Sequence, residues 1–579
     1  MKAFRFVIHY LKPHYKWAIG SPLWVGLEVV AELVQPFFMA RIINEGVLSG
    51  NVGQIYHWGI WMVVVSFVGV VGGLLSIFAA GKVSYSFGAD MRLALFEKIT
   101  RFSAENLDKF QTNSLITRIT SDVFRVQSVI QSSMRLLFRS PLLFIGAIFM
   151  VLTTSAKLSG VLLVLLPVLL FCVYAIIRRA FPVFMTIQKK TDRLNTVVQE
   201  SLAGVRVIKA YTQEKKEMKR FVEANDDLID SNLKVSKLVV LLGPVMTFVL
   251  NIGIALCVYA GARLMEMEQS VNVGDVMAVT NYLTQILMSL MMAQRIIMSI
   301  TEAQASLIRL QEVMETDGPV DSVAEVNKRS GGQTDFSIEF DHVWFKYDKS
   351  AADETRNYVL KDVSFRLEEG ETLGIIGATG SGKSTVAQLL QRFYEADRGT
   401  VRIGGRDILA YDKKAIHRDV SLCMQKVLLF SGTLAENLSW GRPEATEEKM
   451  MEACRKAQIY EFVQTLDEKL NYKVKQGGVN LSGGQKQRLS IARAFVAQPR
   501  VLILDDCMNA LDMRTESMVK KELSKMKCTK IIISQRISTL RDADKILLME
   551  NGEVLASGTH YELMQCSTVY QEICRTQLL

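Results

Sequence analysis

The sequence predicts two architectures joined in one chain: a helical membrane domain with long cytoplasmic helical extensions, followed by an α/β domain built around a phosphate-binding loop. Long apolar stretches fill the first half of the chain, up to about residue 300. After about residue 335, strand-like and helix-like patterns alternate as in a soluble α/β protein, beginning with two period-two runs at residues 336–340 and 343–347 that predict strands. A complete glycine-rich loop at residues 377–385 directly follows a strand-like run and precedes a helix-like run, which is the context that such a loop requires.

Six segments are apolar enough over the roughly 20 residues that a helix needs to cross a bilayer. They lie approximately at residues 17–38, 58–80, 136–154, 158–177, 238–260 and 276–298. We therefore assign residues 1–315 to the membrane domain. A polar stretch marked by Gly and Pro at 316–335 is a linker, and residues 336–579 form the α/β domain.

The connections between these segments alternate between short and long, and basic residues gather in the long ones. Residues 39–57, 155–157 and 261–275 hold one Lys or Arg each, whereas residues 81–135 hold eight and residues 178–237 hold thirteen. By the positive-inside rule, the long connections and both termini face the cytoplasm of a multi-pass protein in the plasma membrane. The net charge of +9 is thus mainly a topology signal, and we expect no nucleic-acid partner.

The long connections are predicted to be helical rather than disordered. Residues 81–130 and 180–235 carry apolar side chains at helical spacing with few helix breakers, so the spans continue far into the cytoplasm and return. The turns are expected near 104–114 and 208–216. At the start of the chain, residues 4–13 combine cations and aromatics in a short amphipathic stretch that suits a helix lying in the membrane interface. Such long helical extensions are expected to provide a docking surface at their ends for a soluble domain.

The glycine-rich loop has the residues that bind phosphate and magnesium. It consists of Gly377, Ala378, Thr379, Gly380, Ser381, Gly382, Lys383, Ser384 and Thr385. The glycines let the backbone wrap closely around phosphate with its amides pointing inward. Lys383 supplies a cation, Ser384 offers a hydroxyl to Mg²⁺, and the start of the following helix adds a favourable dipole.

Two further segments belong to the same chemistry. The apolar run 501–504 ends in Asp505, the carboxylate expected to complete the magnesium site. Residues 481–485 read Leu-Ser-Gly-Gly-Gln and open a helix, so they form a second anion cradle. A chain with one phosphate loop needs no second cradle for the same nucleotide. The simplest explanation is that this cradle serves nucleotide held by another subunit.

Together these residues resemble the ATP-binding cassette (ABC) transporters, specifically exporter half-transporters with six spans fused ahead of one nucleotide domain. The resemblance covers essentially the whole chain and implies ATP and Mg²⁺ as cofactors. It also implies that Tyr347 stacks on adenine, that Gln425 touches Mg²⁺ and that Asp512 belongs to the D-loop. The turns at 104–114 and 208–216 would hold coupling helices, one docking on this chain's nucleotide domain and one on the partner's.

Two positions depart from the family pattern. Where the family carries a glutamate that polarises the attacking water, this chain has Asp506, and where it carries a histidine that contacts the γ-phosphate, this chain has Gln535. Aspartate is one methylene shorter, and a misplacement of about 1 Å can cost on the order of a hundredfold in rate. Glutamine can donate a hydrogen bond to phosphate but cannot carry a positive charge. We expect this site to bind ATP well and to hydrolyse it poorly.

The signature itself is intact, with Ser482, Gly483, Gly484 and Gln485 all in place. In a head-to-tail dimer it faces the partner's nucleotide, so the chain resembles the degenerate-site subunit of heterodimeric bacterial multidrug exporters. The resemblance thus implies a partner half-transporter with the catalytic Glu and His and a corrupted signature. A homodimer, a lipid flippase and a regulatory subunit that binds ATP without helping transport remain as alternatives.

The membrane segments carry few clues to the cargo. Glu28 and Glu32 lie four residues apart on one face of the first span, just ahead of Pro36. They form either a site for cationic substrates or a proton-linked gate, or else they pair with basic groups such as Arg135 or Arg139. Several methionines in the sixth span modestly favour a pocket for diverse hydrophobic compounds. We expect ATP-driven export, by alternating access, of small hydrophobic, amphipathic or cationic compounds in contact with membrane lipid.

Overall fold

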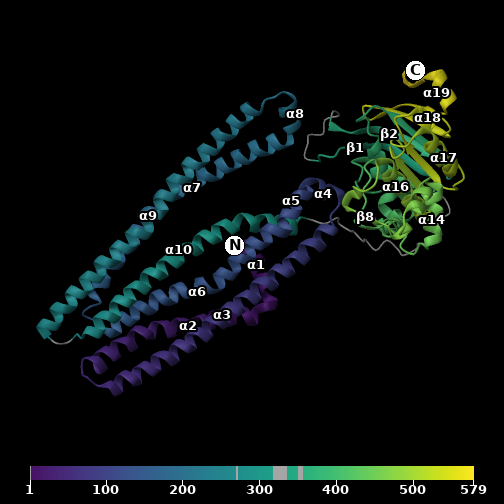
Figure 1. Ribbon diagram of the computed structural model, residues 1–579. Coiled ribbons are helices and arrows are strands. Elements are labelled where there is room, and N and C mark those ends of the chain that lie inside the picture. Colours follow the sequence, from purple (N-terminus) through teal and green to yellow (C-terminus); the bar gives the residue numbers. More distant parts are fainter. Residues whose placement is uncertain (1, 269–270, 317–335, 350–356, 579) are drawn as a thin grey trace. The chain divides into compact units, whose positions relative to one another are not determined.

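The computed structural model describes residues 2–268, 271–316, 336–349 and 357–578, drawn as ribbon in Figure 1. The chain divides into two compact units. The first comprises Met1–Thr100 and Thr112–Thr316, and the second comprises Arg101–Gln111 and Asp317–Leu579. From residue 317 on, the linker predicted at 316–335 lies outside the described residues.

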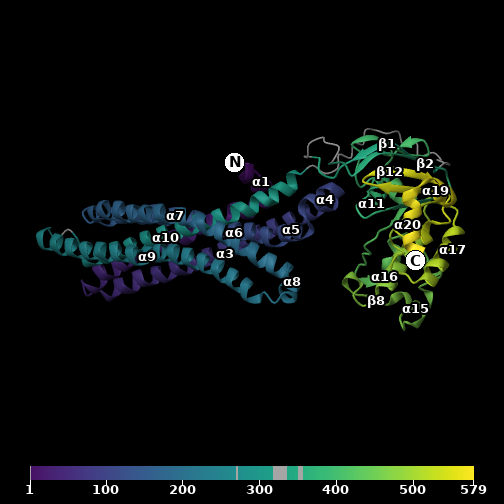
Figure 2. The same cartoon turned by 90° about the horizontal axis from the view of Figure 1, so that it is seen from above.

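The first unit consists of helices, most of them long (Figures 1 and 2). They are α1 (Lys2–Leu11), α2 (Tyr15–Arg41), α3 (Val52–Thr100), α5 (Thr112–Thr117), α6 (Val123–Thr154), α7 (Gly160–Ala203), α8 (Val205–Ala210), α9 (Glu214–Glu268) and α10 (Val273–Glu315). Helix α2 packs against α3, α6 against α10, and α7 against α9. Helices suit apolar segments of this length because they satisfy every backbone hydrogen bond internally.

Within the part of the chain that the structure describes, five helical stretches are long and apolar enough to cross a membrane. They are Phe6–Val47, Val52–Thr100, Thr112–Thr154, Glu214–Met267 and Val273–Ala293. The span predicted at 158–177 lies in α7, where the described apolar stretch, Gly160–Ile176, is shorter than these five.

Several helices are much longer than a bilayer. Helix α3 has 49 residues and α9 has 55, so each extends roughly 70–80 Å against about 30 Å of hydrocarbon. The predicted cytoplasmic extensions are therefore present as continuous helices. The turns between them carry short helices: α4 (Ala104–Phe110) and α5 in the first, and α8, which begins three residues before the predicted turn at 208–216, in the second.

A buried carboxylate paired with a partly exposed arginine connects the base of α6 to α10. Asp122 is 1 % exposed and accepts hydrogen bonds from Arg309 Nε at 2.8 Å and from Ser306 Oγ at 2.9 Å. Arg118 Nη1 donates to the backbone carbonyl of Arg309 at 2.7 Å, which adds a second contact between the same elements. Such contacts tie the helical extension to the helix that leads toward the second unit.

The second unit contains an α/β domain with three sheets. Its strands are β1 (Ile338–Phe345), β2 (Leu360–Leu367), β3 (Thr372–Gly377), β4 (Arg398–Ile403), β5 (Arg406–Asp407), β6 (Val420–Cys423), β7 (Gly432–Thr433), β8 (Lys473–Val474), β9 (Val501–Asp505), β10 (Thr529–Ile533), β11 (Lys545–Glu550) and β12 (Glu553–Gly558). The main sheet has the order β12-β11-β3-β10-β9-β6, and a four-stranded antiparallel sheet has the order β2-β1-β4-β5. Every residue of β9 and β10 is buried, as expected for central parallel strands.

Helices cover this main sheet and complete the domain. They are α11 (Lys383–Leu390), α12 (Lys413–Asp419), α13 (Leu434–Ser439), α14 (Glu447–Lys456), α15 (Tyr460–Thr465), α16 (Gly483–Ala497), α17 (Met513–Ser524), α18 (Ile537–Leu540), α19 (His560–Cys566) and α20 (Thr568–Leu578). The helical membrane domain followed by an α/β domain confirms the predicted fold class.

One detail of the strand prediction is wrong. The sequence pattern suggests two strands, at 336–340 and 343–347, but the structure has the single strand β1. Its register shifts between Phe340 and Val343, where His342 has a left-handed φ of +50°. The irregularity turns Val343 back toward the core, which keeps the buried alternation in phase on both sides of the shift.

The short helix α4 belongs to the second unit. Tyr394 donates a hydrogen bond from its hydroxyl to the Asp108 carboxylate, and Lys349 Nζ lies 3.3 Å from Glu105 Oε2. This turn between two long helices therefore makes polar contacts with the chain's own α/β domain, as expected for one of the two coupling helices.

Replacing Asp122 by Ala should lower the free energy of unfolding of the helical unit by about 2 kcal/mol, because it removes charge-assisted hydrogen bonds from a buried position. Thermal unfolding in detergent micelles measures the loss. Glu223→Ala is the matched control, because Glu223 is exposed and lies 4.0 Å from Lys219 in a surface pair. That change should cost about 0.5 kcal/mol or less, and equal effects of the two variants would contradict the role given to Asp122.

Candidate nucleotide site

Parallel strand pairing brings the predicted residues to one edge of the main sheet. Strands β3 and β9 both pair in parallel with β10, so the carboxyl ends of all three lie side by side. Gly377 ends β3, Asp505 ends β9, and Gln535 follows β10 by two residues. Residues more than 150 positions apart in the sequence are thus neighbours in the fold.

The loop after β3 has the backbone that its glycines predict. Gly380 and Gly382 have φ of +86° and +96°, in the left-handed region that glycine adopts freely. A Cβ on Gly377 would lie 2.1 Å from the carbonyl oxygen of Met549. Ala378, Thr379 and Gly380 form the exposed tip of the loop, whereas Ser381, Gly382, Lys383 and Thr385 are buried. The loop ends in α11, so the free amides of the first helical turn face the same space.

Lys383 lies inside the loop. Its Nζ donates to the carbonyl oxygens of Gly377 at 2.9 Å and Ala378 at 2.7 Å, and it lies 3.3 Å from Ser381 Oγ. Burial lowers the pKa of this ammonium, while the nearby carboxylates of Asp506 and Asp505 act in the opposite direction. An ammonium held by loop oxygens can exchange them for phosphate oxygens with little movement.

Ser384 and Asp505, which the sequence predicts as metal ligands, are in direct contact. Ser384 Oγ donates to Asp505 Oδ1 at 3.1 Å. Burial, together with the neighbouring charge of Asp506, raises the pKa of Asp505, and the Ser384 hydrogen bond and Lys383 only partly offset this. A divalent cation would stabilise the ionised carboxylate, and hydroxyl and carboxylate oxygens are ligands that Mg²⁺ prefers. The donor set therefore fits Mg²⁺ bound together with a nucleotide phosphate.

Asp506 has a strained backbone and a fixed side chain. Its φ is +50°, and its amide donates to the carbonyl of Ile533 at 3.0 Å. One carboxylate oxygen accepts from Asn509 Nδ2 at 2.7 Å, and the other lies 3.5 Å from Gln425 Nε2. The structure thus brings Gln425, which the sequence predicts as a magnesium contact, to the carboxylate beside the metal-binding pair.

A residue of the C-terminal helix α20 hydrogen-bonds the turn that carries Gln535. Gln577, on α20, donates from Nε2 to the carbonyl of Gln535 at 2.6 Å and accepts from the amide of Ile537 at 2.8 Å. Arg536 in the same turn donates to the carbonyl of Asn509 at 3.2 Å. Sequence analysis missed Gln577, because a lone glutamine near the end of a chain has no recognisable pattern.

Tyr347 lies at the rim of the site, and its side chain is partly exposed. Its hydroxyl donates to Gln388 Oε1 at 2.6 Å and lies 3.1 Å from Thr385 Oγ1. Its ring packs edge-on against Tyr394, with centroids 5.2 Å apart. Burial raises the pKa of the phenol. The side chain remains 42 % exposed, so a ring face is available for stacking on a base.

The signature residues start α16. Ser482 caps the helix by accepting from the amide of Gln485 at 3.3 Å, and the amide of Ser482 donates to Gln485 Oε1 at 2.8 Å. A Cβ on Gly483 would meet no atom within 4 Å. Among the described residues, the hydrogen bonds of Ser482–Gln485 are local, and none reaches the loop at 377–385.

The predicted D-loop residue, Asp512, has a local partner. It caps α17 and accepts from the amide of Thr515 at 3.1 Å, and this hydrogen bond lowers the pKa of its carboxyl. A neighbouring residue of the same loop, Ala510, donates its amide to Gln487 Oε1 at 3.0 Å. The D-loop is thereby connected both to the signature helix and, through Asn509, to Asp506.

Two family models match the chain. Residues 26–290 match the ABC transporter transmembrane region, and residues 360–509 match the ABC transporter model. The chain belongs to the ABC transporter family. It is an ABC exporter with fused transmembrane and ATP-binding domains, so the loop after β3 and the carboxylates after β9 lie in an ATP-hydrolysing domain.

Related proteins align with most or nearly all of this ABC exporter. The ABC transporter ATP-binding protein YfiB of Bacillus subtilis is 38% identical, with 98% of both chains covered. The fatty acid ABC transporter ATP-binding/permease protein of Mycobacterium bovis is 32% identical, covering 84% of this chain and 75% of that protein. The ATP-dependent lipid A-core flippase 1 of Colwellia psychrerythraea is 28% identical over 98% and 95%. A solved structure of a bacterial Atm1-family ABC exporter with ATP bound shares the fold, with a TM-score of 0.79, 23% identity and 98% of each chain covered.

Asp505→Asn should remove the contribution of Mg²⁺ to ATP affinity, about tenfold or more, because it removes a charged ligand. The same change should stabilise the nucleotide-free domain. The raised pKa of Asp505 means that this carboxyl binds a proton more tightly in the folded wild type than in the unfolded chain, so the contribution of Asp505 to stability falls as pH rises from about 4 toward 7.

Melting temperatures across this pH range, with and without Mg²⁺ and ATP, measure both effects. The melting temperature of the variant should exceed that of the wild type by a margin that grows with pH. A variant that is less stable at neutral pH, or that keeps its Mg²⁺ response, would contradict this assignment of Asp505. Asp512→Asn serves as the control, because that carboxylate caps a helix at the surface.

Proposed function

We propose that this ABC exporter works as one half of a heterodimer and moves amphipathic compounds out of the cytoplasm, with its own ATP site degenerate and its signature acting on the partner's ATP. One observation supports the proposal most strongly. Asp506 and Gln535 occupy the two positions that drive hydrolysis, inside a site whose phosphate loop and Ser384–Asp505 pair are complete, while the signature that would serve the partner's ATP is intact.

The contacts of Asp506 support weak hydrolysis. Its carboxylate is buried, and its hydrogen bond to Asn509 holds the shorter side chain toward the D-loop. A water activated at this position would lie about 1 Å farther from the base than a glutamate allows, which is enough to cost on the order of a hundredfold. Gln535 offers only a neutral donor to the γ-phosphate. ATP binding depends on other groups, so it remains strong.

Transport follows from alternating access. In the proposed cycle, two ATP molecules hold the two nucleotide domains together, and hydrolysis at the partner's catalytic site separates them. When the nucleotide domains close, the movement is transmitted to α3 and α6 through α4. Helix α4 contacts this chain's own nucleotide domain through Asp108 and Glu105. The short helix α8 is proposed to dock on the partner, and its exposed Val207 and the adjacent exposed Tyr211 provide apolar surface for that contact.

The proposed cargo is a membrane-soluble amphiphile. Met277, Met288 and Met291 of α10 are exposed within the chain, which favours an adaptable apolar surface. Relatives named as a fatty acid transporter and a lipid A-core flippase support lipid-like molecules as well as the hydrophobic drugs suggested by sequence. Lipid export is therefore the second candidate function, and it shares the same ATP-driven cycle.

Restoring the family residues should activate this site. The double variant Asp506→Glu with Gln535→His, combined with a partner whose own catalytic glutamate is replaced by Gln, should raise the ATPase rate about 10- to 100-fold over the same pair with this chain unmodified. Phosphate release from purified pairs in lipid nanodiscs measures the rate. Lys383→Ala in the restored chain is the control and should return the rate to background. An unchanged rate in the restored pair would count against the reading of both positions.

The alternative of a homodimer is tested by comparing the chain alone with the co-purified pair. The pair should hydrolyse ATP at least about tenfold faster than this chain alone. Ser482→Ala in this chain should abolish the substrate-stimulated part of the rate, which a purely regulatory subunit would not do. Brisk, Mg²⁺-dependent hydrolysis by this chain on its own would favour the homodimer.

A further inference from the structure

A groove between α2 and α3 combines apolar walls with a charged floor. Its volume is about 410 Å³. The polar lining residues are Glu28, Glu32, Gln35, Ser66 and Arg135. The apolar lining includes Val70, Leu74 and Ile77 of α3, all of which expose large side chains. The groove therefore has the two-part character of an amphiphile, a polar region beside a hydrocarbon surface.

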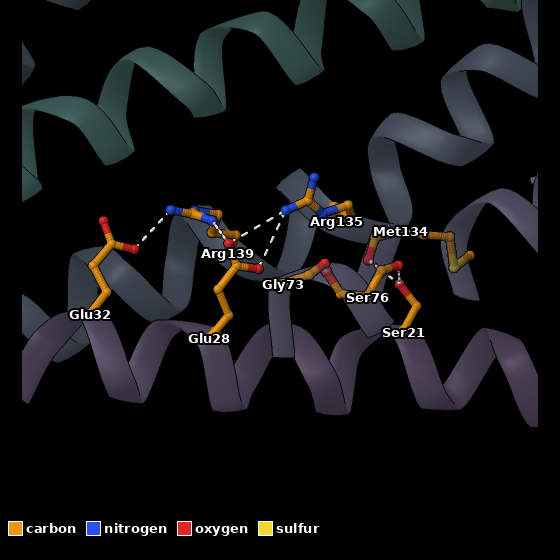
Figure 3. A network of polar contacts seen from close by, with 8 residues as sticks. All are labelled: Ser21, Glu28, Glu32, Gly73, Ser76, Met134, Arg135 and Arg139. Carbon is orange, nitrogen blue, oxygen red and sulfur yellow. Dashed lines mark hydrogen bonds and ion pairs between the residues drawn. The ribbon is translucent and has the colours of Figure 1, made fainter. Parts of the chain in front are cut away.

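Four charged residues form a linked chain of ion pairs at this floor (Figure 3). Arg139 bonds Glu28 through Nη1 and Glu32 Oε2 through Nη2, the latter at 2.8 Å. Arg135 Nη2 lies 3.3 Å from Glu28 Oε2. The structure thus favours the pairing alternative left open by the sequence for Glu28 and Glu32. The four charges sum to zero.

The two ends of this chain of charges retain bonding capacity toward the groove. Glu32 is 37 % exposed and, among the described residues, hydrogen-bonds Arg139 through one of its two carboxylate oxygens. At the other end, the Arg135 side chain is 28 % exposed and, among the described residues, bonds Glu28 through Nη2. Arg139 and Glu28, at 18 % and 15 %, are the inner members. The groove therefore presents a negative group and a positive group.

Close helix packing holds the inner members in place. A Cβ on Gly73 of α3 would lie 3.3 Å from Glu28 Cδ, and a Cβ on Gly69 would lie 3.0 Å from Ala31 Cβ. Glycine at these positions lets α3 approach α2, so that Glu28 is enclosed while Glu32 and Arg135 stay accessible. The charged floor is thus part of a packed interface, with its more exposed side chains at its two ends.

Charge balance selects the ligand. A cation bound at Glu32 competes with Arg139 for that carboxylate, and an anion bound at Arg135 weakens the contact of Arg135 with Glu28. In a low-dielectric site, each singly charged ligand leaves the cluster with an uncompensated charge, which is strongly unfavourable. A ligand with one positive and one negative group can contact both ends and leave the cluster neutral.

We propose that this groove binds zwitterionic amphiphiles, with an ammonium group at Glu32, a phosphate or carboxylate group at Arg135, and an acyl chain along Val70, Leu74 and Ile77. The step from binding to export rests on the proposed function, since only an exporter turns this ligand into cargo. Binding itself depends on the groove alone.

Binding of three ligands with the same dodecyl chain tests the proposal. Dodecylphosphocholine, dodecyl phosphate and dodecyltrimethylammonium are titrated into the full chain in maltoside micelles without ATP, and affinity is measured by microscale thermophoresis. Phosphocholine without a chain separates headgroup recognition from binding of the amphiphile. The zwitterion should bind at least about tenfold more tightly than either the purely anionic or the purely cationic ligand, and free phosphocholine should bind weakly.

Two variants should shift this preference in opposite directions. Glu32→Gln leaves the cluster with a net positive charge, so dodecyl phosphate should become the preferred ligand. Arg135→Gln leaves it net negative, so dodecyltrimethylammonium should become preferred. Glu266→Gln, which changes an exposed carboxylate paired with Arg263 away from the groove, should keep the wild-type order.

The same order of affinities in the wild type and both groove variants would overturn the proposal, because the ligands would then be partitioning without using these charges. A change in oligomeric state with Glu32→Gln, seen by size-exclusion chromatography with light scattering, would also overturn it and assign the groove to subunit packing. ATPase stimulation measured afterwards separates the two claims. Selective binding without stimulation would contradict export of this ligand but not the groove.

Discussion

The parallel register of β3, β10 and β9 is the constraint on which the nucleotide site depends. These strands are apolar and buried, so they can pair only in the interior of the main sheet. Their shared direction places Gly377, Asp505 and the turn before Gln535 at one edge. A one-residue slip in either pairing would turn Asp505 away from Ser384. The chemistry of the site is therefore a consequence of strand packing.

Polar contacts join the elements around this edge to one another, and similar contacts join the helices of the helical unit. The D-loop, the Gln535 turn and α20 are joined by hydrogen bonds through Asn509, Arg536 and Gln577. The short helix α4 contacts the same unit through Asp108 and Glu105. In the helical unit, the ion pair between buried Asp122 and Arg309 joins α10 to the base of α6. Each connection uses charged or amide groups, which allow more than one arrangement at modest cost and so suit parts that move during a cycle.

Contiguous patterns in the sequence predicted most of the fold and the nucleotide site. The glycine loop and Asp505 are recognisable because their chemistry requires fixed residue types at fixed spacing. The register shift at His342 could not be predicted, because both halves of β1 alternate correctly by themselves. The support from Gln577 depends on tertiary packing. For Glu28, sequence spacing fixes the face of the helix but not the distance to Arg135 or Arg139, and only the structure provides that distance.

The central claim is that this chain retains ATP while its partner hydrolyses it. The direct measurement is the identity of the nucleotide bound to each subunit during turnover, obtained by photo-crosslinking 8-azido-ATP labelled on both the adenine and the γ-phosphate to the co-purified pair. The account predicts that this chain carries label from both positions, as unhydrolysed ATP, while the partner retains only the adenine label, as ADP. Loss of the γ-phosphate label from both subunits at equal rates would contradict it.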